Sequence, residues 1–194
     1  MLLPSSLPRF PRLTWLAPFT LLAGCTGLPE GTQPVSGFQL DDYLGQWYEI
    51  ARLDHGFEAG LECVTAEYTR AENGGIQVIN RGFDPESQRW ESAEGHASFV
   101  DQPNIGRLKV SFFGPFYAGY NVLALDPDYR HALVAGPDRD YLWILAREPT
   151  LDATTYDGLV DRARELDFPV DELIQVSQSP EQCGNRDIPD TTPR

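Results

Sequence analysis

The chain has 194 residues, 41% of them hydrophobic and 23% charged, which predicts one globular domain with a sizeable core. Its 29 acidic residues outnumber its 15 basic ones, so the formal net charge is −14, and Lys109 is the only lysine. Such an acidic surface repels phosphate groups, which argues against nucleic-acid binding and against docking on anionic lipids through a basic patch. Three cysteines without a C-x-x-C pair predict neither a disulfide framework nor a zinc site.

The N-terminal segment has the pattern of an export signal. Arg9 and Arg12 precede an apolar run at residues 13–23, which is too short to cross a bilayer that needs about 20 residues. The run ends in Leu22-Ala23-Gly24-Cys25, which resembles the lipobox of bacterial lipoproteins, where cleavage precedes the cysteine. The resemblance implies that residues 1–24 are a lipoprotein signal peptide. The alternative is an ordinary signal peptide that happens to contain a cysteine.

On the lipobox interpretation, Cys25 is the lipid anchor of the mature chain. Its three acyl chains would hold it in a membrane effectively permanently, because two already suffice. Thr26 follows Cys25 where an Asp would change the sorting, and this implies the outer membrane, at its periplasmic face. Loss of two signal arginines changes the net charge from −14 to −16. Residues 25–37 are rich in Gly, Pro, Thr and Gln and are expected to form a flexible tether.

The rest of the chain alternates between turn signals and runs of β-branched and aromatic residues. A later stretch has the period of a helix: its apolar stripe begins at Tyr156 and ends at Leu166, and Pro169 stops it. The spacing of the strands predicts an all-β fold, either an antiparallel up-and-down barrel or a sandwich, with one helix packed outside. The predicted strands are residues 47–53, 63–70, 76–82, 89–99, 107–113, 120–125, 131–135 and 141–147, with a short last strand at 173–176.

Three motifs in this region resemble those of the lipocalin family. Gly45-Gln46-Trp47 matches the G-x-W motif that begins the first lipocalin strand. Asp128-Tyr129 matches the second motif, although Pro127 replaces the usual Thr, and Arg147 matches the third, at the end of the last barrel strand. The resemblance covers residues 38–184 and leaves 185–194 as a disordered tail. Together with the lipobox it points to the bacterial outer-membrane lipocalins, relatives of apolipoprotein D, and it implies an eight-stranded barrel that forms a calyx.

The resemblance also assigns roles inside the barrel. Trp47 is expected to close the floor, with the Arg147 guanidinium on its ring in a cation–π pair of about 0.5–2 kcal/mol. Strand alternation places Glu49, as a structural residue, and Ala51 on the face of Trp47. Phe116 and Tyr117 are expected at the rim. For any single inward residue, filling the barrel is the simpler interpretation; the candidate ligand-cavity set is Trp143, Tyr141, Phe112, Tyr120, Val122, Val134 and Phe99, with Leu145 on the same face as Trp143.

Two cysteines remain in the predicted domain. The apolipoprotein D relatives carry cysteines at the points that match Cys63 and Cys183, so the resemblance implies a disulfide between them. Such a bridge closes a loop of about 120 residues and contributes about 4–5 kcal/mol in the chain-entropy description. The alternative is a free nucleophilic Cys63 in a lipocalin enzyme.

The remaining titratable residues form no recognisable catalytic, metal or cofactor motif. His55, His96 and His131 lack metal-ligand spacing, although haem or tetrapyrrole binding through His96 or His131 is an alternative function. We therefore expect a non-enzymatic outer-membrane lipoprotein that binds, stores or transports fatty acids or lysophospholipids for envelope maintenance. Its expected partners are that apolar ligand and the outer membrane, with no nucleic acid, and a homodimer is left open.

Overall fold

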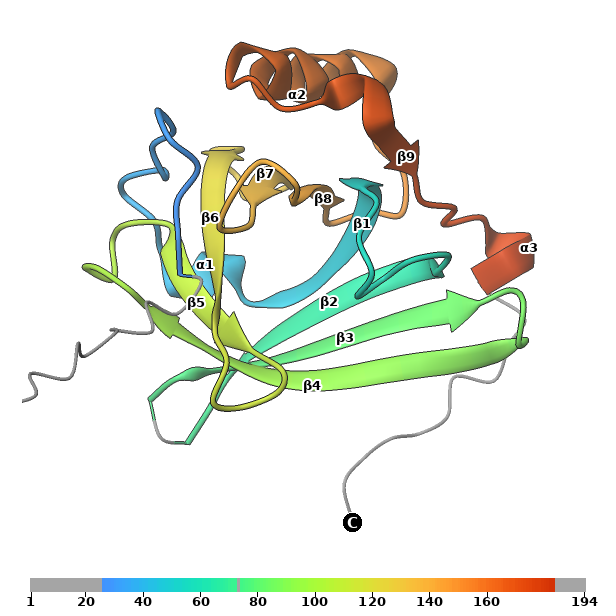
Figure 1. Ribbon diagram of the computed structural model, residues 1–194, viewed down its shortest axis with the longest axis horizontal. Helices are drawn as coiled ribbons and strands as arrows, with labels where there is room; N and C mark the ends of the chain where they lie inside the picture. Colours follow the sequence, from blue (N-terminus) through green and yellow to red (C-terminus); the bar gives the residue numbers. More distant parts are fainter. Residues whose placement is uncertain (1–25, 73, 184–194) are drawn as a thin grey trace, which may run out of the picture.

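A computed structural model describes residues 26–72 and 74–183, which form a closed antiparallel barrel with helix α2 outside it (Figure 1). The strands follow one another around the barrel from β2 to β8 and then β1, which pairs with β2 and closes the sheet. Closure excludes the sandwich and confirms the barrel. In chain order the elements are α1 (Leu40–Tyr43), β1 (Gly45–Leu53), β2 (Glu62–Arg70), β3 (Ile76–Asp84), β4 (Arg89–Phe99), β5 (Arg107–Ser111), β6 (Ala118–Leu125), β7 (His131–Ala135), β8 (Leu142–Ala146), α2 (Ala153–Glu165), η1 (Val170–Glu172), β9 (Leu173–Gln175) and α3 (Pro180–Cys183).

Strand β1 contains an irregularity that decides which side chains face inward. It pairs with β8, and the register between them shifts by one residue between Glu49 and Ala51. An extra residue of this kind reverses the inside–outside alternation of a strand. Ala51 was expected on the inner face with Trp47, and this expectation is wrong: Ala51 packs in the cluster between barrel and helix. Arg52 takes the inner face instead and reaches Glu49.

The apolar residues form two cores, one on each side of the sheet. The inner core fills one end of the barrel around Trp47, with Phe38 and Tyr43 from the segment before β1. The outer core joins the barrel wall to α2, where Leu159 and Ala163 lie on the predicted apolar stripe. Figure 1 shows α2 lying across the outside of the barrel beyond β7 and β8. No helix among residues 26–72 and 74–183 has both the length and the apolar character needed to span a membrane.

The two ends of the barrel differ. Helix α1 and the turns at 71–75, 100–106 and 126–130 lie at the end that the inner core fills, which we call the floor. The loops at 54–61, 85–88, 112–117 and 136–141 surround the other end, which we call the mouth. The predicted strand at 107–113 ends at Ser111, so that Phe112 and Phe113 belong to a mouth loop.

Residues 26–37 lie along the barrel, although the composition predicted a flexible tether. Asn121 Nδ2 donates to the Gly27 carbonyl at 3.1 Å, and the Gly106 amide donates to the Val35 carbonyl at 2.8 Å. The main chain at Gly27 lies so close to β6 that a Cβ on Gly119 would be 2.4 Å from the Gly27 oxygen, so position 119 requires glycine. Gly27 also contacts Pro137 of the β7–β8 loop. The described chain therefore begins on the outer wall of the barrel, where Thr26 contacts Arg107 at the start of β5 and Gly27 contacts a mouth loop. The predicted signal peptide, Cys25 and the tail 185–194 lie outside the described residues.

Candidate ligand-binding site

The barrel encloses an apolar cavity that opens at the mouth. Its volume is about 470 Å³, within the roughly 300–1,000 Å³ that is usual for small-molecule sites. Apolar atoms dominate its walls, which suits an aliphatic chain because burial of such a chain gains about 25 cal/mol per Å². The apolar wall residues include Val64, Ala66, Ile76, Val78, Ala97, Leu108, Val110 and Leu145.

The floor is held by a tryptophan–arginine pair. The Arg147 guanidinium lies 4.0 Å from the centre of the Trp47 ring, and the Trp47 indole donates to the Tyr43 carbonyl at 2.9 Å. Arg147 also donates to the carbonyls of Asp42 and Gln46, each at 2.8 Å, and to that of Tyr129 at 3.2 Å. One guanidinium thus ties α1, β1 and the β6–β7 turn together beneath the cavity.

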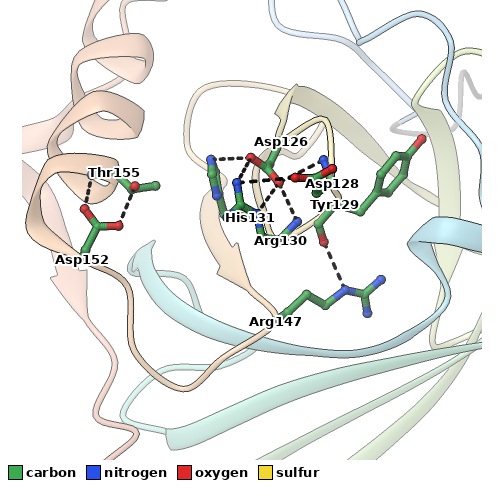
Figure 2. Close-up of polar contacts among 8 residues, drawn as sticks. All are labelled: Asp126, Asp128, Tyr129, Arg130, His131, Arg147, Asp152 and Thr155. Carbon is green, nitrogen blue, oxygen red and sulfur yellow. Dashed lines mark hydrogen bonds and ion pairs between the residues drawn. The ribbon is translucent and has the colours of Figure 1, made fainter.

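The turn that supplies the Tyr129 carbonyl is itself fixed by a carboxylate. Figure 2 shows Asp126 facing Arg130 and His131, with Arg147 reaching the Tyr129 oxygen from below. Arg130 Nε donates to Asp126 Oδ2 at 2.9 Å, and this hydrogen bond is the main cause that lowers the pKa of Asp126 to about 2. His131 Nε2 lies 3.9 Å from the same carboxylate. These residues stabilise the floor from outside the cavity.

Three tyrosine hydroxyls meet just above the floor. The Tyr120 hydroxyl lies 2.6 Å from that of Tyr43 and accepts from Tyr68 at 2.9 Å. Burial is the main cause that raises the pKa of each phenol, so all three stay protonated at physiological pH. They give the lower end of the cavity a neutral polar spot within apolar walls.

A second polar group, which we call the upper cluster, lies on the cavity wall nearer the mouth. It consists of Glu49 and Arg52 of β1, His55 and Glu58 of the β1–β2 loop, Asn80 of β3 and Trp143 of β8. Arg52 Nη1 donates to Glu49 Oε1 at 2.6 Å, and Trp143 Nε1 donates to Glu58 Oε2 at 3.0 Å. Burial, followed by the nearby Glu58 carboxylate, raises the pKa of Glu49 well above its ordinary value.

The mouth carries exposed aromatic side chains. Phe113 and Phe116 are 70% and 75% exposed, and Phe57 from the opposite loop packs its ring 5.0 Å from that of Phe112. Lys109 extends its ammonium group over the Tyr117 ring, 4.9 Å from its centre. These rings form an exposed apolar patch beside the entrance to the cavity.

The structure brings part of the predicted cavity set together. Trp143, Tyr141, Phe112 and Tyr120 line the cavity. Phe99, Val122 and Val134 do not, and for them the expectation is corrected: they pack within the inner core, where Phe99 meets Phe38 with ring centres 6.0 Å apart. Alternation along a strand gives the face of a residue but not its depth in the barrel. Phe116 and Tyr117 lie at the mouth, as expected for rim residues.

Cysteine and histidine positions bear on the two alternative functions. Cys63 and Cys183 form a disulfide with Cα atoms 5.6 Å apart, so the expected bridge is confirmed and Cys63 carries no free thiol. His96 is exposed on the barrel exterior, and His131 pairs with Asp126 beneath the floor. The histidine that lines the cavity is His55, which the sequence did not single out. Among the described residues, no His, Cys, Asp and Glu cluster has the geometry of a metal site.

A closed eight-stranded barrel with an apolar calyx and a Trp–Arg floor is the architecture of a lipocalin. A lipocalin-like domain matches residues 38–178, and the chain belongs to this family of ligand-binding proteins. It is 51% identical over 159 residues to the outer membrane lipoprotein Blc of Vibrio cholerae, covering 81% of this chain and 93% of that one. The Escherichia coli K12 protein of the same name is 53% identical over 150 residues, covering 77% and 85%.

More distant relatives share the same architecture. Mouse apolipoprotein D is 32% identical over 152 residues, which cover 73% of this chain and 78% of that protein. The structure of insecticyanin from the tobacco hornworm, Manduca sexta, superposes with a TM-score of 0.65 at 21% identity, over 81% of this chain and 89% of that one. That likeness shows the fold. The expected place among relatives of bacterial outer-membrane lipocalins and apolipoprotein D is confirmed.

Proposed function

We propose that this lipocalin is anchored to the outer membrane through acylated Cys25 and carries fatty acids or lysophospholipids, with its mouth facing the bilayer. The observation that carries the proposal is that Gly27, near the start of the described chain, contacts a loop at the mouth of the apolar calyx. Thr26 is one residue from Cys25, and Gly27 contacts the β7–β8 loop at the mouth. The proposed anchor is therefore two residues along the chain from a contact with a mouth loop.

The chemistry of the calyx supports an acyl chain as the ligand. Its walls between the tyrosine hydroxyls and the upper cluster are aliphatic, and an aliphatic chain leaves no polar group unpaired there. A polar head group stays in the upper part or at the mouth, where polar side chains and water are available. The sequence identity of 51–53% to proteins named outer membrane lipoproteins supports the same anchoring here.

The aromatic mouth supports contact with the bilayer. Transfer of Phe113 and Phe116 from water into an apolar phase gains about 1–2 kcal/mol each, given that a fully buried Phe gains roughly 1.5–3 kcal/mol. That gain alone is too small to hold an acidic protein on a membrane. With an acyl anchor beside it, the patch needs only to orient the barrel. Lipid then passes between bilayer and calyx without crossing water.

The cargo is tested by native mass spectrometry of the full lipoprotein extracted from the outer membrane without added lipid. We expect an adduct with the mass of a fatty acid or lysophospholipid. Ala97→Phe places a bulky ring inside the cavity and should strongly reduce the adduct, whereas Ser98→Phe, the next residue on the outer face of β4, should keep it. An empty wild-type protein that also takes up no added lysophospholipid, or an adduct that is not reduced in Ala97→Phe, contradicts the proposed cargo.

The orientation is tested with a fluorescent label on the same lipoprotein in vesicles of phosphatidylethanolamine and phosphatidylglycerol. The label is attached at Phe116→Cys in the mouth or at Gln102→Cys, an exposed position near the floor. Brominated lipids should quench the first label strongly and the second weakly. Equal quenching shows that the mouth does not face the bilayer. A mass spectrum of the N-terminal peptide without acyl chains shows separately that the anchor is absent.

A further inference from the structure

The upper cluster holds a buried carboxylate, that of Glu58, which does not pair with the arginine of the cluster. Glu49 and Glu58 are 3% and 4% exposed, and the carboxyl that Arg52 reaches is that of Glu49, whose pKa is raised by burial and by the nearby Glu58. Arg52 pairs with Glu49 and donates its other nitrogen to the main-chain carbonyls of Glu58 and Leu61, at 2.7 and 3.2 Å. The Glu58 carboxylate is left with neutral donors: the Trp143 indole, the Asn80 amide at 3.4 Å, and the Glu49 carboxyl, whose hydrogen bond with Glu58 helps to raise its pKa.

The same cluster has buried polar atoms that lack a partner. Both ring nitrogens of His55 and the Asn80 Oδ1 atom have no hydrogen bond to any described residue, and the His55 side chain is 6% exposed. His55 Nε2 lies 3.5 Å from Glu58 Oε2, too far for a good hydrogen bond. An unsatisfied buried polar group lowers the stability of the fold by about 1–3 kcal/mol. A cluster with only a structural role would leave this loss uncompensated. All three side chains line the cavity.

The unused atoms define the chemistry of a ligand group. Burial lowers the pKa of His55, so its ring is neutral and offers one acceptor nitrogen. Asn80 Oδ1 and the Glu58 carboxylate are further acceptors, and the carboxylate adds negative charge. A positively charged group with several N–H donors satisfies all three. Neutral hydroxyl groups supply no charge, and a carboxylate or phosphate would be repelled by Glu58.

Aromatic rings complete the surroundings. The Tyr141 and Trp143 rings stack with centres 6.2 Å apart, and His55 lies 5.3 and 5.1 Å from them. Aromatic faces attract ammonium groups by a further 0.5–2 kcal/mol, roughly. A quaternary ammonium would contact the aromatic rings, but it has no N–H group and would leave the acceptor atoms unpaired. A primary ammonium can contact the rings and also donate hydrogen bonds to the acceptors, so it fits the upper cluster better.

We infer that the upper cluster is a subsite for the primary ammonium of a lipid head group, held by Glu58, Asn80 and His55. The inference rests on the proposed function, because the acyl chain of the same lipid occupies the apolar calyx below. It makes the protein selective for ethanolamine-type lysophospholipids over fatty acids and over lysophospholipids with glycerol head groups. Glu58 is the residue that sets this selectivity, through a loop that folds into the mouth.

The test compares three lysophospholipids with one acyl chain on the delipidated lipoprotein by calorimetry. They are lysophosphatidylethanolamine, its N-acetylated form, which lacks the charge, and lysophosphatidylglycerol. We expect the free amine to bind at least ten-fold more tightly than either of the others. In Glu58→Gln this advantage should fall to within about two-fold, while lysophosphatidylglycerol binds as well as or better than before. Glu91→Gln, an exposed change on β4, should keep the full preference.

Equal binding of the three lipids by the wild-type protein overturns the subsite and leaves the calyx function standing. A preference that survives in Glu58→Gln overturns the role of this residue and with it the proposed subsite. Binding of none of the three contradicts the proposed function itself. The wild-type comparison needs no variant, so the subsite is tested even if Glu58→Gln does not fold.

Discussion

Trp143 carries both a stability and a binding role, and two substitutions separate them. Its indole forms cavity wall on one side, and on the other its Nε1 donates to the buried Glu58 carboxylate at 3.0 Å. A Trp→Ala change in a closed core costs about 3–5 kcal/mol. Because one side of the Trp143 indole already faces the cavity, its removal should cost only about 2 kcal/mol of packing energy. The lost hydrogen bond to a buried charged group adds about 1.5–3 kcal/mol.

Trp143→Ala should therefore lower the free energy of unfolding by about 4 kcal/mol, and Trp143→Phe, which keeps a ring and loses only the donor, by about 2 kcal/mol. Affinity should follow a different order. For lysophosphatidylglycerol, which has no amine, the Phe variant should bind within two-fold of the wild type, and the Ala variant about ten-fold more weakly because the chain loses a wall.

Urea denaturation followed by circular dichroism measures the first quantity, and calorimetric titration measures the second. Trp90→Ala is the matched control, because Trp90 packs on Phe83 and does not line the cavity. It should change stability and leave affinity unchanged. The reasoning is refuted if Trp143→Ala loses stability while its affinity stays at the wild-type value, since Trp143 is then core and not binding wall.

Three further predictions concern the anchor and the floor. Cys25→Ser should leave the precursor uncleaved at that site and yield no membrane-bound mature protein; a variant that still fractionates with the outer membrane contradicts the anchor. Arg147→Lys should lower the free energy of unfolding, measured by urea denaturation, by about 2 kcal/mol, because a lysine ammonium cannot keep all three hydrogen bonds that the guanidinium donates to carbonyls. Its ligand affinity should stay unchanged. Asp126 has a folded pKa of about 2, below its unfolded value, so its stabilisation is present above about pH 4 and is lost as the pH falls through 2. The shift corresponds to about 2 kcal/mol, and screening around the exposed Arg130 reduces this to about 1 kcal/mol, so wild type and Asp126→Asn should differ by that amount at pH 7 and converge near pH 2.

The local signals of the sequence were sufficient for the strands and for helix α2, but not for the short helices α1 and α3 or for the closed end. Alternating apolar residues bounded by turn residues gave strands whose ends differ from the observed ones by a few residues, such as 107–113 against Arg107–Ser111. Trp47 and Arg147, 100 positions apart in the chain, could be paired only because the family resemblance supplied the partner. The same holds for Cys63 and Cys183.

Of the upper cluster, alternation placed Glu49 and Trp143 inward, but the other members could not be predicted, for a specific reason. Inward positions on β1 were assigned by strict alternation from Trp47, which selects Ala51 and leaves Arg52 outside. A one-residue shift against β8 exchanges them, and it arises from pairing with a distant strand, not from the local sequence. His55 and Glu58 lie in a loop whose sequence carries no strand or helix period to fix where its side chains point.

The sequence by itself determined an all-β fold with an outer helix, because apolar periodicity is a local property that each segment carries alone. It also determined the family, through three ordered motifs. Only the tertiary structure decided the depth of each side chain in the barrel, the inward turn of Arg52, and the docking of residues 26–37 beside Gly119. Those features depend on contacts between segments far apart in the chain, whose geometry is fixed when the barrel closes and the polar groups inside it find their partners.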